Sequence, residues 1–304
     1  MHKIFIDGRS GTTGLRIEER LAARRDLELL ALPEHLLFDT AARAEMINQA
    51  DVTFLCLPDE VAQEIVPLVT NPDSVIIDAS TAHRTAPGWA YGFPELGADY
   101  RAAIVSGKCI AGPGCHASGF IALVRPLIEA GLLPKDTKLS CLSLTGYTGG
   151  GLAKIAEYED AARTRGDALS APMQYALGQQ HKHLPEMCVH TGLRHAPAFC
   201  PVIADYDCGM EVTIPLFDLP VQAVFECYKA FYSNAAMLCV TEPGHPRPAN
   251  CMRGRDSMEL TVEGNGERLL LIARFDNLGK GASGAAVQCM NLVIGAEETE
   301  GLAP

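Results

Sequence analysis

The first third of the chain alternates short apolar runs with amphipathic stretches. Residues 3–7 form the first run, and similar runs follow at 27–32, 51–58 and 75–80. Each run is continuously apolar, which is typical of a strand covered on both faces. The intervening stretches, notably 60–69, have helical spacing. This alternation predicts a doubly wound parallel sheet, in which ligands bind beyond the carboxyl ends of the strands.

The later part of the chain has a different pattern. Residues 210–216 and 257–262 alternate apolar and polar positions, as strands with one open face do. Residues 137–144 and 269–277 are predicted as further strands, and 145–151 as an irregular glycine-rich loop. We therefore expect an α/β protein that combines a Rossmann-like, doubly wound parallel sheet with a second, α+β catalytic domain.

A glycine-rich turn joins the first predicted strand to a predicted helix at 15–21. Its glycines are spaced GxxGxxG rather than GxGxxG. In this context a backbone can approach a pyrophosphate at the helix N-terminus, so the turn favours a dinucleotide. A plain strand-to-helix turn is the alternative interpretation. The cofactor-binding residues expected here are Gly8, Arg9, Ser10, Gly11, Thr12, Thr13 and Gly14.

The identity of the nicotinamide cofactor depends on the charges near its ribose. No acid stands at the end of the second predicted strand, and the nearest one is Glu34. Arg9 lies within the glycine turn. Because a 2′-phosphate requires a cation and no carboxylate, both observations favour NADP(H) over NAD(H). The alternative for Arg9 is a solvated loop charge.

Cys115 follows a tight turn made of Gly112, Pro113 and Gly114, and it precedes an apolar run with helical spacing. A cysteine at this point lies in the first turn of a helix. The free N–H groups and the helix dipole there favour negative charge. We therefore expect a thiol pKa below the usual value of about 8.5, and a thiolate near neutrality. The alternative is a small buried hydrophobe.

Composition restricts the class of protein. The chain has 304 residues, a formal net charge of −12 and a pI of about 5.2, which argues against a nucleic-acid partner. Its eleven cysteines lack regular spacing and any CxxC pair, so neither a disulfide framework nor a metal site is expected. The chain begins in a predicted strand rather than a signal peptide, and no apolar run approaches the roughly 20 residues that span a bilayer. We expect a cytoplasmic protein with no membrane partner.

Two later segments carry candidate chemistry. His181, His183 and Glu186 lie close together in the sequence. A thiolate enzyme needs an acid/base with a pKa near neutrality, which histidine provides, and a carboxylate could orient it. A glycine-rich segment containing Lys280 leads into a predicted helix at 285–296, where it could meet phosphate, cofactor or substrate. The alternatives are a structural histidine and an ordinary helix cap.

Six ordered segments carry a resemblance that extends over nearly the whole chain. They are residues 6–14, 78–84, 91–95, 113–115, 181–187 and 277–288. Through them the chain resembles the N-acetyl-γ-glutamyl-phosphate reductase family in its shorter form. The resemblance implies a fold of the semialdehyde-dehydrogenase or glyceraldehyde-phosphate-dehydrogenase type. It also implies a nucleotide domain of 1–114 plus 285–304, a catalytic and oligomerisation domain of 115–284, and a homodimer or homotetramer.

The resemblance implies NADPH-dependent reduction of an acyl phosphate, N-acetyl-γ-glutamyl phosphate, to N-acetylglutamate semialdehyde and inorganic phosphate in arginine biosynthesis. In that scheme Cys115 forms a thioester, His183 is the acid/base and Glu186 orients it. Arg84 is expected to bind a substrate carboxylate or phosphate. The other expected ligand contacts are Ser118 and His181 for substrate, and Pro58, Ser80, Asn277, Lys280 and Gly281 for cofactor.

Two departures from the family pattern leave questions open. Members often carry a tyrosine where this chain has His116, so the acid/base could be His116, His181 or His183. Members also often carry a lysine where this chain has Leu152, with Lys154 two positions later, which puts a phosphate-binding cation on that loop in doubt.

Other functions compete with this interpretation. They are another acyl-phosphate reductase such as aspartate-semialdehyde dehydrogenase, a nucleotide-sensing protein that has lost catalysis, and a cysteine hydrolase without a nucleotide. The segment at 181–186 favours the acetylglutamyl family over the aspartyl one, and the intact Cys115, His183 and glycine turn argue against lost catalysis. Whether the acyl group is free or attached to a carrier stays open.

Overall fold

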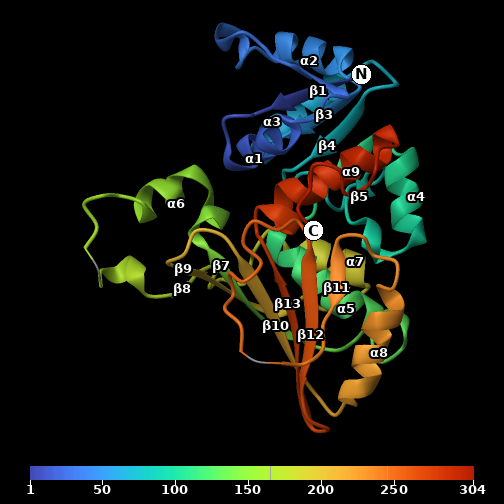
Figure 1. The fold of residues 1–304 in the computed structure, drawn as a ribbon, viewed down its shortest axis with the longest axis vertical. Helices are drawn as coiled ribbons and strands as arrows, with labels where there is room; N and C mark the ends of the chain where they lie inside the picture. The colour runs from blue at the N-terminus through green and yellow to red at the C-terminus, as the bar shows by residue number, and fades with distance from the viewer. Residues whose placement is uncertain (165, 245) are drawn as a thin grey trace. The chain divides into compact units, whose positions relative to one another are not determined.

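The chain divides into two compact units, each with its own sheet (Figure 1). The computed structural model describes residues 1–164, 166–244 and 246–304. The first unit comprises Met1–Pro113 and Ala282–Leu302, and the second comprises Gly114–Gly281 and Ala303–Pro304. The expected nucleotide domain extends to residue 304. The last two residues group instead with the second unit, where the Asp256 N–H donates to the Ala303 carbonyl oxygen at 2.6 Å.

The first unit is built on a six-stranded sheet with the order β2-β1-β3-β4-β6-β5. Every pairing in it is parallel, as the continuous apolar runs predict, and β3 and β4 are buried along their whole length. The sequence indicated four of these strands, and the structure adds β5 and β6. The strands are β1 (His2–Asp7), β2 (Leu27–Leu30), β3 (Val52–Leu55), β4 (Val75–Asp78), β5 (Ala90–Tyr91) and β6 (Cys109–Ala111).

Two apolar clusters cover the two faces of this sheet. Ile4 and Ile6 of β1 pack in one cluster with Val287, whereas Phe5 packs in the other with Ile47. This alternation follows from the period of two along a strand. The helices of the unit are α1 (Thr12–Leu21), α2 (Thr40–Gln49), α3 (Asp59–Ile65), α4 (Ala98–Ser106) and α9 (Gly284–Ile294). The helical stretch predicted at 60–69 is α3 followed by a 3₁₀ turn, because a proline follows Val66.

The second unit contains a mixed seven-stranded sheet with the order β11-β12-β13-β10-β7-β9-β8. Its helices are α5 (Cys115–Glu129), α6 (Gly151–Tyr158), α7 (Leu184–Thr191) and α8 (Val221–Phe231). Its strands are β7 (Ser140–Gly146), β8 (Met173–Gln174), β9 (Ala198–Ala204), β10 (Met210–Phe217), β11 (Leu238–Val240), β12 (Met258–Gly264) and β13 (Arg268–Phe275). The predicted α/β fold with an α+β second domain is confirmed.

Helix α5 lies against β10 and β13, and a glycine makes that approach possible. A Cβ at Gly119 would come within 2.6 Å of Val212 Cγ2 and 2.9 Å of Phe275 Cε1. The helix therefore rests directly on the sheet one turn after Cys115. This packing fixes the height of the helix start above the sheet.

Two local predictions for the second unit were wrong. The segment expected as an irregular loop is regular: β7 continues to Gly146, a 3₁₀ turn follows, and α6 begins at Gly151 with φ +73°. Strand β12 has no open face over Met258–Val262. Its outward polar side chains are covered by the segment after β11, where Thr241 Oγ1 lies 3.0 Å from Thr261 Oγ1 and Arg247 pairs with Glu259.

None of the helices in the described part of the chain combines the length and apolar character that crossing a membrane requires.

Candidate active site

Cys115 is the first residue of α5, and this prediction is confirmed. Gly114 is the N-cap and offers no side-chain cap to the first turn. The thiol-bearing residue is partly exposed, and a Cβ at Gly281 would lie 3.0 Å from the Cys115 Cβ. The uncapped N–H groups and the helix dipole favour a negative charge on the sulfur, and Gly281 leaves room beside it.

Glu186 holds the turn that precedes the cysteine. It lies in the first turn of α7 with 1% exposure, and its Oε2 accepts a hydrogen bond from Gly114 N–H at 3.0 Å. The sequence assigned Glu186 to orient His183. The contact found here connects it to the backbone next to Cys115, so its position helps to determine the geometry of the turn before Cys115.

Three imidazoles gather near the start of α5. The ring centroids of His116 lie 5.6 Å from those of both His181 and His183, and His181 and His183 are 4.6 Å apart. The ring of Phe199 packs at 5.3 Å from His116 and 5.1 Å from His181. The backbone N–H of His183 also donates to His181 Nδ1 at 3.2 Å. The two predicted histidines therefore lie together, and His116 joins them.

His116 is unsuited to acid/base work near neutrality. It is 3% exposed, with Nδ1 at 2.7 Å from Ser143 Oγ and Nε2 at 2.7 Å from Tyr175 Oη. Burial, and then the neighbouring His181, lower the pKa of His116 to about 3. Its ring stays neutral at working pH and both nitrogens are engaged. Of the three candidates for the acid/base role, His181 and His183 remain.

Two side chains expected to bind ligands are engaged within the protein. The Ser118 hydroxyl is fully buried and donates to the Gly114 carbonyl oxygen at 3.0 Å. Asn277 accepts a hydrogen bond from Gly209 N–H at 2.8 Å and donates to Thr148 Oγ1 at 3.0 Å. These contacts favour structural roles for both residues.

Lys280 and Gly281 belong to a π-helical turn, Gly279–Ser283. Such turns are often found at functional sites. Asp276 organises this one: its Oδ1 accepts from Leu278 N–H at 2.8 Å, and its main-chain oxygen accepts from Gly281 N–H at 3.1 Å. Lys280 is only 1% exposed. No role was predicted for Asp276, because its spacing to these donors is ordinary in a loop.

The glycine turn of the first unit has the geometry that a diphosphate requires. Gly8 has φ +83°, and a Cβ there would overlap the Cys56 carbonyl oxygen. A Cβ at Gly14 would lie 2.6 Å from the Gly8 oxygen, and Gly11 N-caps α1 without a side-chain cap. A cavity of about 170 Å³ lies at this helix start, next to α3, whose N-cap is Pro58. It is lined by Gly11, Thr12, Thr13, Cys56, Leu57 and Ala79. These residues fit a nucleotide diphosphate.

The charges around this turn are unevenly available to a ligand. Arg9 is 53% exposed, with its guanidinium 3.3 Å from Glu18. Asp7, directly before the turn, pairs with Arg43 at 2.8 Å. Burial raises the pKa of Asp7, against the opposing effect of Arg43. Glu34 begins a 3₁₀ turn four residues beyond the end of β2. Arg9 is therefore the exposed cation of the turn itself.

Two more predicted residues lie at the carboxyl ends of β4 and β6. The Ser80 hydroxyl donates to Asp78 Oδ2 at 2.7 Å. Arg84 is 9% exposed and donates from Nε to the Gly112 carbonyl oxygen at 2.9 Å and from Nη2 to that of Ala79 at 3.3 Å. The guanidinium thus connects the ends of two neighbouring strands.

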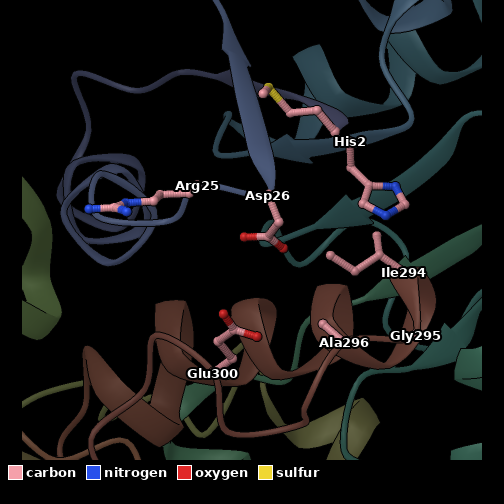
Figure 2. A pocket seen from close by; sticks show the side chains of 8 residues that line it. His2, Arg25, Asp26, Ile294, Gly295, Ala296 and Glu300 are labelled. Carbon is pink, nitrogen blue, oxygen red and sulfur yellow. The ribbon is translucent and has the colours of Figure 1, made fainter.

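The first unit has a second cavity at the opposite edge of its sheet, where β1 and β2 begin. Figure 2 shows the side chains of His2, Asp26 and Glu300 around this opening of about 520 Å³. Arg24 lies 2.6 Å from Asp26 and 3.4 Å from Glu300, and it lowers the pKa of Asp26 to about 2. None of the predicted site residues lines this cavity.

Models of two protein domains match the chain. "Semialdehyde dehydrogenase, NAD binding domain" matches residues 13–104, and "Semialdehyde dehydrogenase, dimerisation domain" matches residues 115–277.

Curated relatives match over nearly the full length. The chain is 42% identical to an N-acetyl-gamma-glutamyl-phosphate reductase of Burkholderia ambifaria, over 96% of each chain. It is 43% identical to N-acetyl-gamma-glutamyl-phosphate reductase 2 of Pseudomonas putida, over 98% of each chain.

Solved structures share the fold at low identity. Aspartate semialdehyde dehydrogenase II of Vibrio cholerae, complexed with ASA, superposes with a TM-score of 0.73 at 16% identity, over 97% of this chain and 98% of that one. Aspartate semialdehyde dehydrogenase with NADP from Candida albicans gives 0.68 at 16% identity, over 97% and 99%. At such identities the likeness concerns the fold alone.

Proposed function

This chain belongs to the semialdehyde dehydrogenase family, and we propose that it catalyses the NADPH-dependent reduction of N-acetyl-γ-glutamyl phosphate to N-acetylglutamate semialdehyde and phosphate. The observation that carries this proposal is Cys115 at the start of α5, partly exposed and followed by His116, whose ring lies 5.6 Å from those of His181 and His183. The substrate is supported by relatives of that name at 42–43% identity. The aspartate semialdehyde dehydrogenases match only at 13–17%.

The proposed reaction begins with the Cys115 thiolate. Its sulfur bonds to the acyl carbon, and the carbon–oxygen bond to phosphate breaks, so that phosphate leaves with the electron pair. N–H groups at the start of α5 stabilise the negative charge on the acyl oxygen. NADPH would supply the hydride that reduces the thioester. His183 or His181 then gives and takes the proton that accompanies release of the aldehyde and return of the thiolate.

The nucleotide turn would hold the cofactor. Backbone N–H groups at Gly11, Thr12 and Thr13 suit the diphosphate, and the exposed Arg9 suits a 2′-phosphate. All eleven cysteines are free thiols in the structure, which suits a reducing compartment, and we propose the cytoplasm.

We also propose a homodimer or homotetramer formed through the sheet of the second unit. Helix α5 covers one face of this sheet through Val212. On the other face Leu142 is 43%, Phe217 67% and Leu270 42% exposed. These three share a face because paired residues lie on the same side of a sheet. Leu142 pairs with Thr213 of β10 and Leu270 with Pro215, and Phe217 follows at the same spacing of two. Replacing Leu142 and Leu270 together by Glu should halve the mass measured by light scattering.

Steady-state kinetics in the reverse direction test the function. Purified protein is given N-acetylglutamate semialdehyde, phosphate and either NADP or NAD. We expect phosphate-dependent reduction of NADP, at least about tenfold better in kcat/KM than with aspartate semialdehyde. Equal or better use of the aspartyl compound would reassign the substrate. Hydrolysis of an acyl compound without nucleotide would favour the cysteine hydrolase, and nucleotide binding without turnover would favour the sensor.

A further inference from the structure

A chain of three hydrogen-bonding side chains lies beside the start of α5. It runs from Ser143 Oγ through both nitrogens of His116 to Tyr175 Oη, with 2.7 Å at each step. Ser143 comes from β7 and is fully buried. His116 directly follows the nucleophile in sequence. Tyr175, which is partly buried, follows β8. The proposed reaction above uses none of the three.

Tyr175 lies on a segment that is fixed in two ways. Its N–H donates to the Pro201 carbonyl oxygen at 3.1 Å. Gln179 then pairs with the Phe199 backbone, donating from Nε2 at 2.7 Å and accepting at Oε1 at 2.8 Å. Within this segment Ala176 has φ +52°, and Gln179 has φ +55°. Two non-glycine residues in the left-handed region within four positions are costly, and such strain concentrates at functional sites.

The Tyr175 phenol is connected to the residue that follows Cys115, because its oxygen lies 2.7 Å from Nε2 of His116. Burial, and then the charge of the Cys115 thiolate, raise the pKa of Tyr175 well above its ordinary value. The phenol therefore keeps its proton at working pH and can act only as a neutral donor or acceptor. A neutral donor close to a thiolate is a means of stabilising developing negative charge.

We propose that Tyr175 is a catalytic hydrogen-bond donor to the sulfur and acyl oxygen at Cys115. His116 is the positioning residue: it donates to the phenolic oxygen and so leaves the phenolic hydrogen available for that hydrogen bond. The proposal rests on the function proposed above. In the required tautomer Ser143 O–H donates to Nδ1, and Nε2–H donates to Tyr175 Oη. The phenolic hydrogen is then directed away from the imidazole. As the sulfur attacks and charge moves to the acyl oxygen, the phenol donates to that oxygen without giving up its proton.

The first test substitutes the phenol. Tyr175→Phe should lower kcat about 10- to 100-fold with the KM for NADP unchanged. It should also raise the pH midpoint for iodoacetamide labelling of Cys115 by about half a unit to one unit, because the thiolate loses a donor. Labelling is followed by mass spectrometry of the Cys115 peptide, which separates it from the other ten cysteines.

A matched control is available in the same unit. Tyr206→Phe removes another phenol, whose hydroxyl is buried without a hydrogen-bond partner among the described residues. It should leave both kcat and the labelling midpoint unchanged. The proposal is wrong if Tyr175→Phe changes kcat by no more than about twofold and the labelling midpoint by no more than about 0.2 pH unit, which is about the scatter of such measurements.

The second test separates positioning from packing. His116→Phe should reproduce both effects of Tyr175→Phe, whereas His116→Gln, whose amide can donate at the ε position, should recover part of kcat and of the midpoint. Ser143→Ala should change kcat and the labelling midpoint in the same direction by a smaller amount. This variant replaces His116→Phe as the test if that protein fails to fold. Equal loss with Gln and Phe, together with an unshifted midpoint in Ser143→Ala, would overturn the positioning role.

The labelling experiment needs no substrate. A wild-type protein that fails to turn over the acetylglutamyl compound, yet shows the midpoint shift in Tyr175→Phe, would contradict the proposed function and leave the proposed hydrogen bond from Tyr175 to the Cys115 sulfur standing. Normal turnover by the wild-type protein, with no midpoint shift and no loss of kcat in Tyr175→Phe, would support the proposed function and contradict the role of Tyr175.

Discussion

The starts of α1 and α5 are alike in backbone and differ in what they serve. Each has a glycine N-cap in extended conformation, Gly11 with φ −76° and Gly114 with φ −74°, and neither has a side-chain cap or an acid in its first turn. At α1 the free N–H groups border a cavity. Helix α5 begins at Cys115, which carries its own sulfur to this position, and Glu186 accepts a hydrogen bond from the Gly114 N–H. One geometry thus suits a bound anion and an anion that the chain supplies.

The two sites also treat cysteine differently. Cys56 lines the cavity at α1, where burial, and then Asp78 and Asp7, raise its thiol pKa to about 12. Cys115 stands at the positive end of a helix dipole. Burial and two nearby carboxylates disfavour the thiolate of Cys56, whereas the N–H groups and dipole of a helix start favour negative charge. We therefore expect position relative to backbone N–H groups, rather than residue type, to distinguish the reactive cysteine.

The largest expected effect comes from removing the sulfur. Cys115→Ser should lower kcat at least about a thousandfold, because a hydroxyl at this helix start stays protonated. NADPH binding, followed by quenching of Trp89 and tyrosine fluorescence, should stay within twofold of wild type. Retained turnover would show that the sulfur at the start of α5 is not the nucleophile, and that the two helix starts do not differ in the proposed way.

Alkylation should discriminate between the two cysteines. At pH 8 Cys56 is almost wholly protonated, since its pKa is about 12, and its thiolate fraction rises only as pH approaches that value. We expect labelling of Cys115 at least about a hundredfold faster than that of Cys56. Peptide mass spectrometry after timed exposure to iodoacetamide measures both, and comparable rates would refute the assignment.

The α1 turn can be broken by a single methyl group. Gly8→Ala should destabilise the protein by about 2 kcal/mol or more and weaken NADPH binding, because the new Cβ would overlap the Cys56 carbonyl oxygen. Gly88→Ala is a matched control with φ +82° and nothing within 4 Å of the added Cβ, so it should cost only about 1 kcal/mol. Urea unfolding and nucleotide titration measure both, and equal costs would show that the overlap is relieved.

The smallest change concerns cofactor choice. Arg9→Ser should reduce the ratio of kcat/KM for NADPH over NADH about tenfold, because an exposed guanidinium makes only a modest contribution to phosphate binding. Neutral substitution of Arg25, which lines the cavity at the opposite edge of the sheet, is the control. An unchanged ratio would assign the 2′-phosphate to another cation.

Sequence reasoning succeeded where the signal was local. Continuous apolar runs predicted β1, β3 and β4, and the turn before Cys115 predicted the start of α5. It missed β5 and β6, because two or three residues are too few to show a period. The α6 segment was misjudged, since its glycines suggested an irregular loop while the chain uses them at a turn and a helix start.

The site was predicted only in part for a similar reason. Cys115, His181 and His183 are apparent from spacing, but the contact between Glu186 and Gly114 joins residues 72 positions apart. Tyr175 follows a two-residue strand and becomes relevant only when β8 pairs with β9. Burial of His116, which removes it as an acid/base, depends on packing that no single segment encodes.

The bare backbone at Gly119 makes catalysis depend on a residue that touches no substrate. Since α5 can sink onto β10 and β13 only where a side chain is missing, any enlargement there would lift the helix and tilt its first residue. A methyl group added at this position would thus displace the Cys115 sulfur and lower kcat by a larger factor than its effect on the melting temperature would suggest.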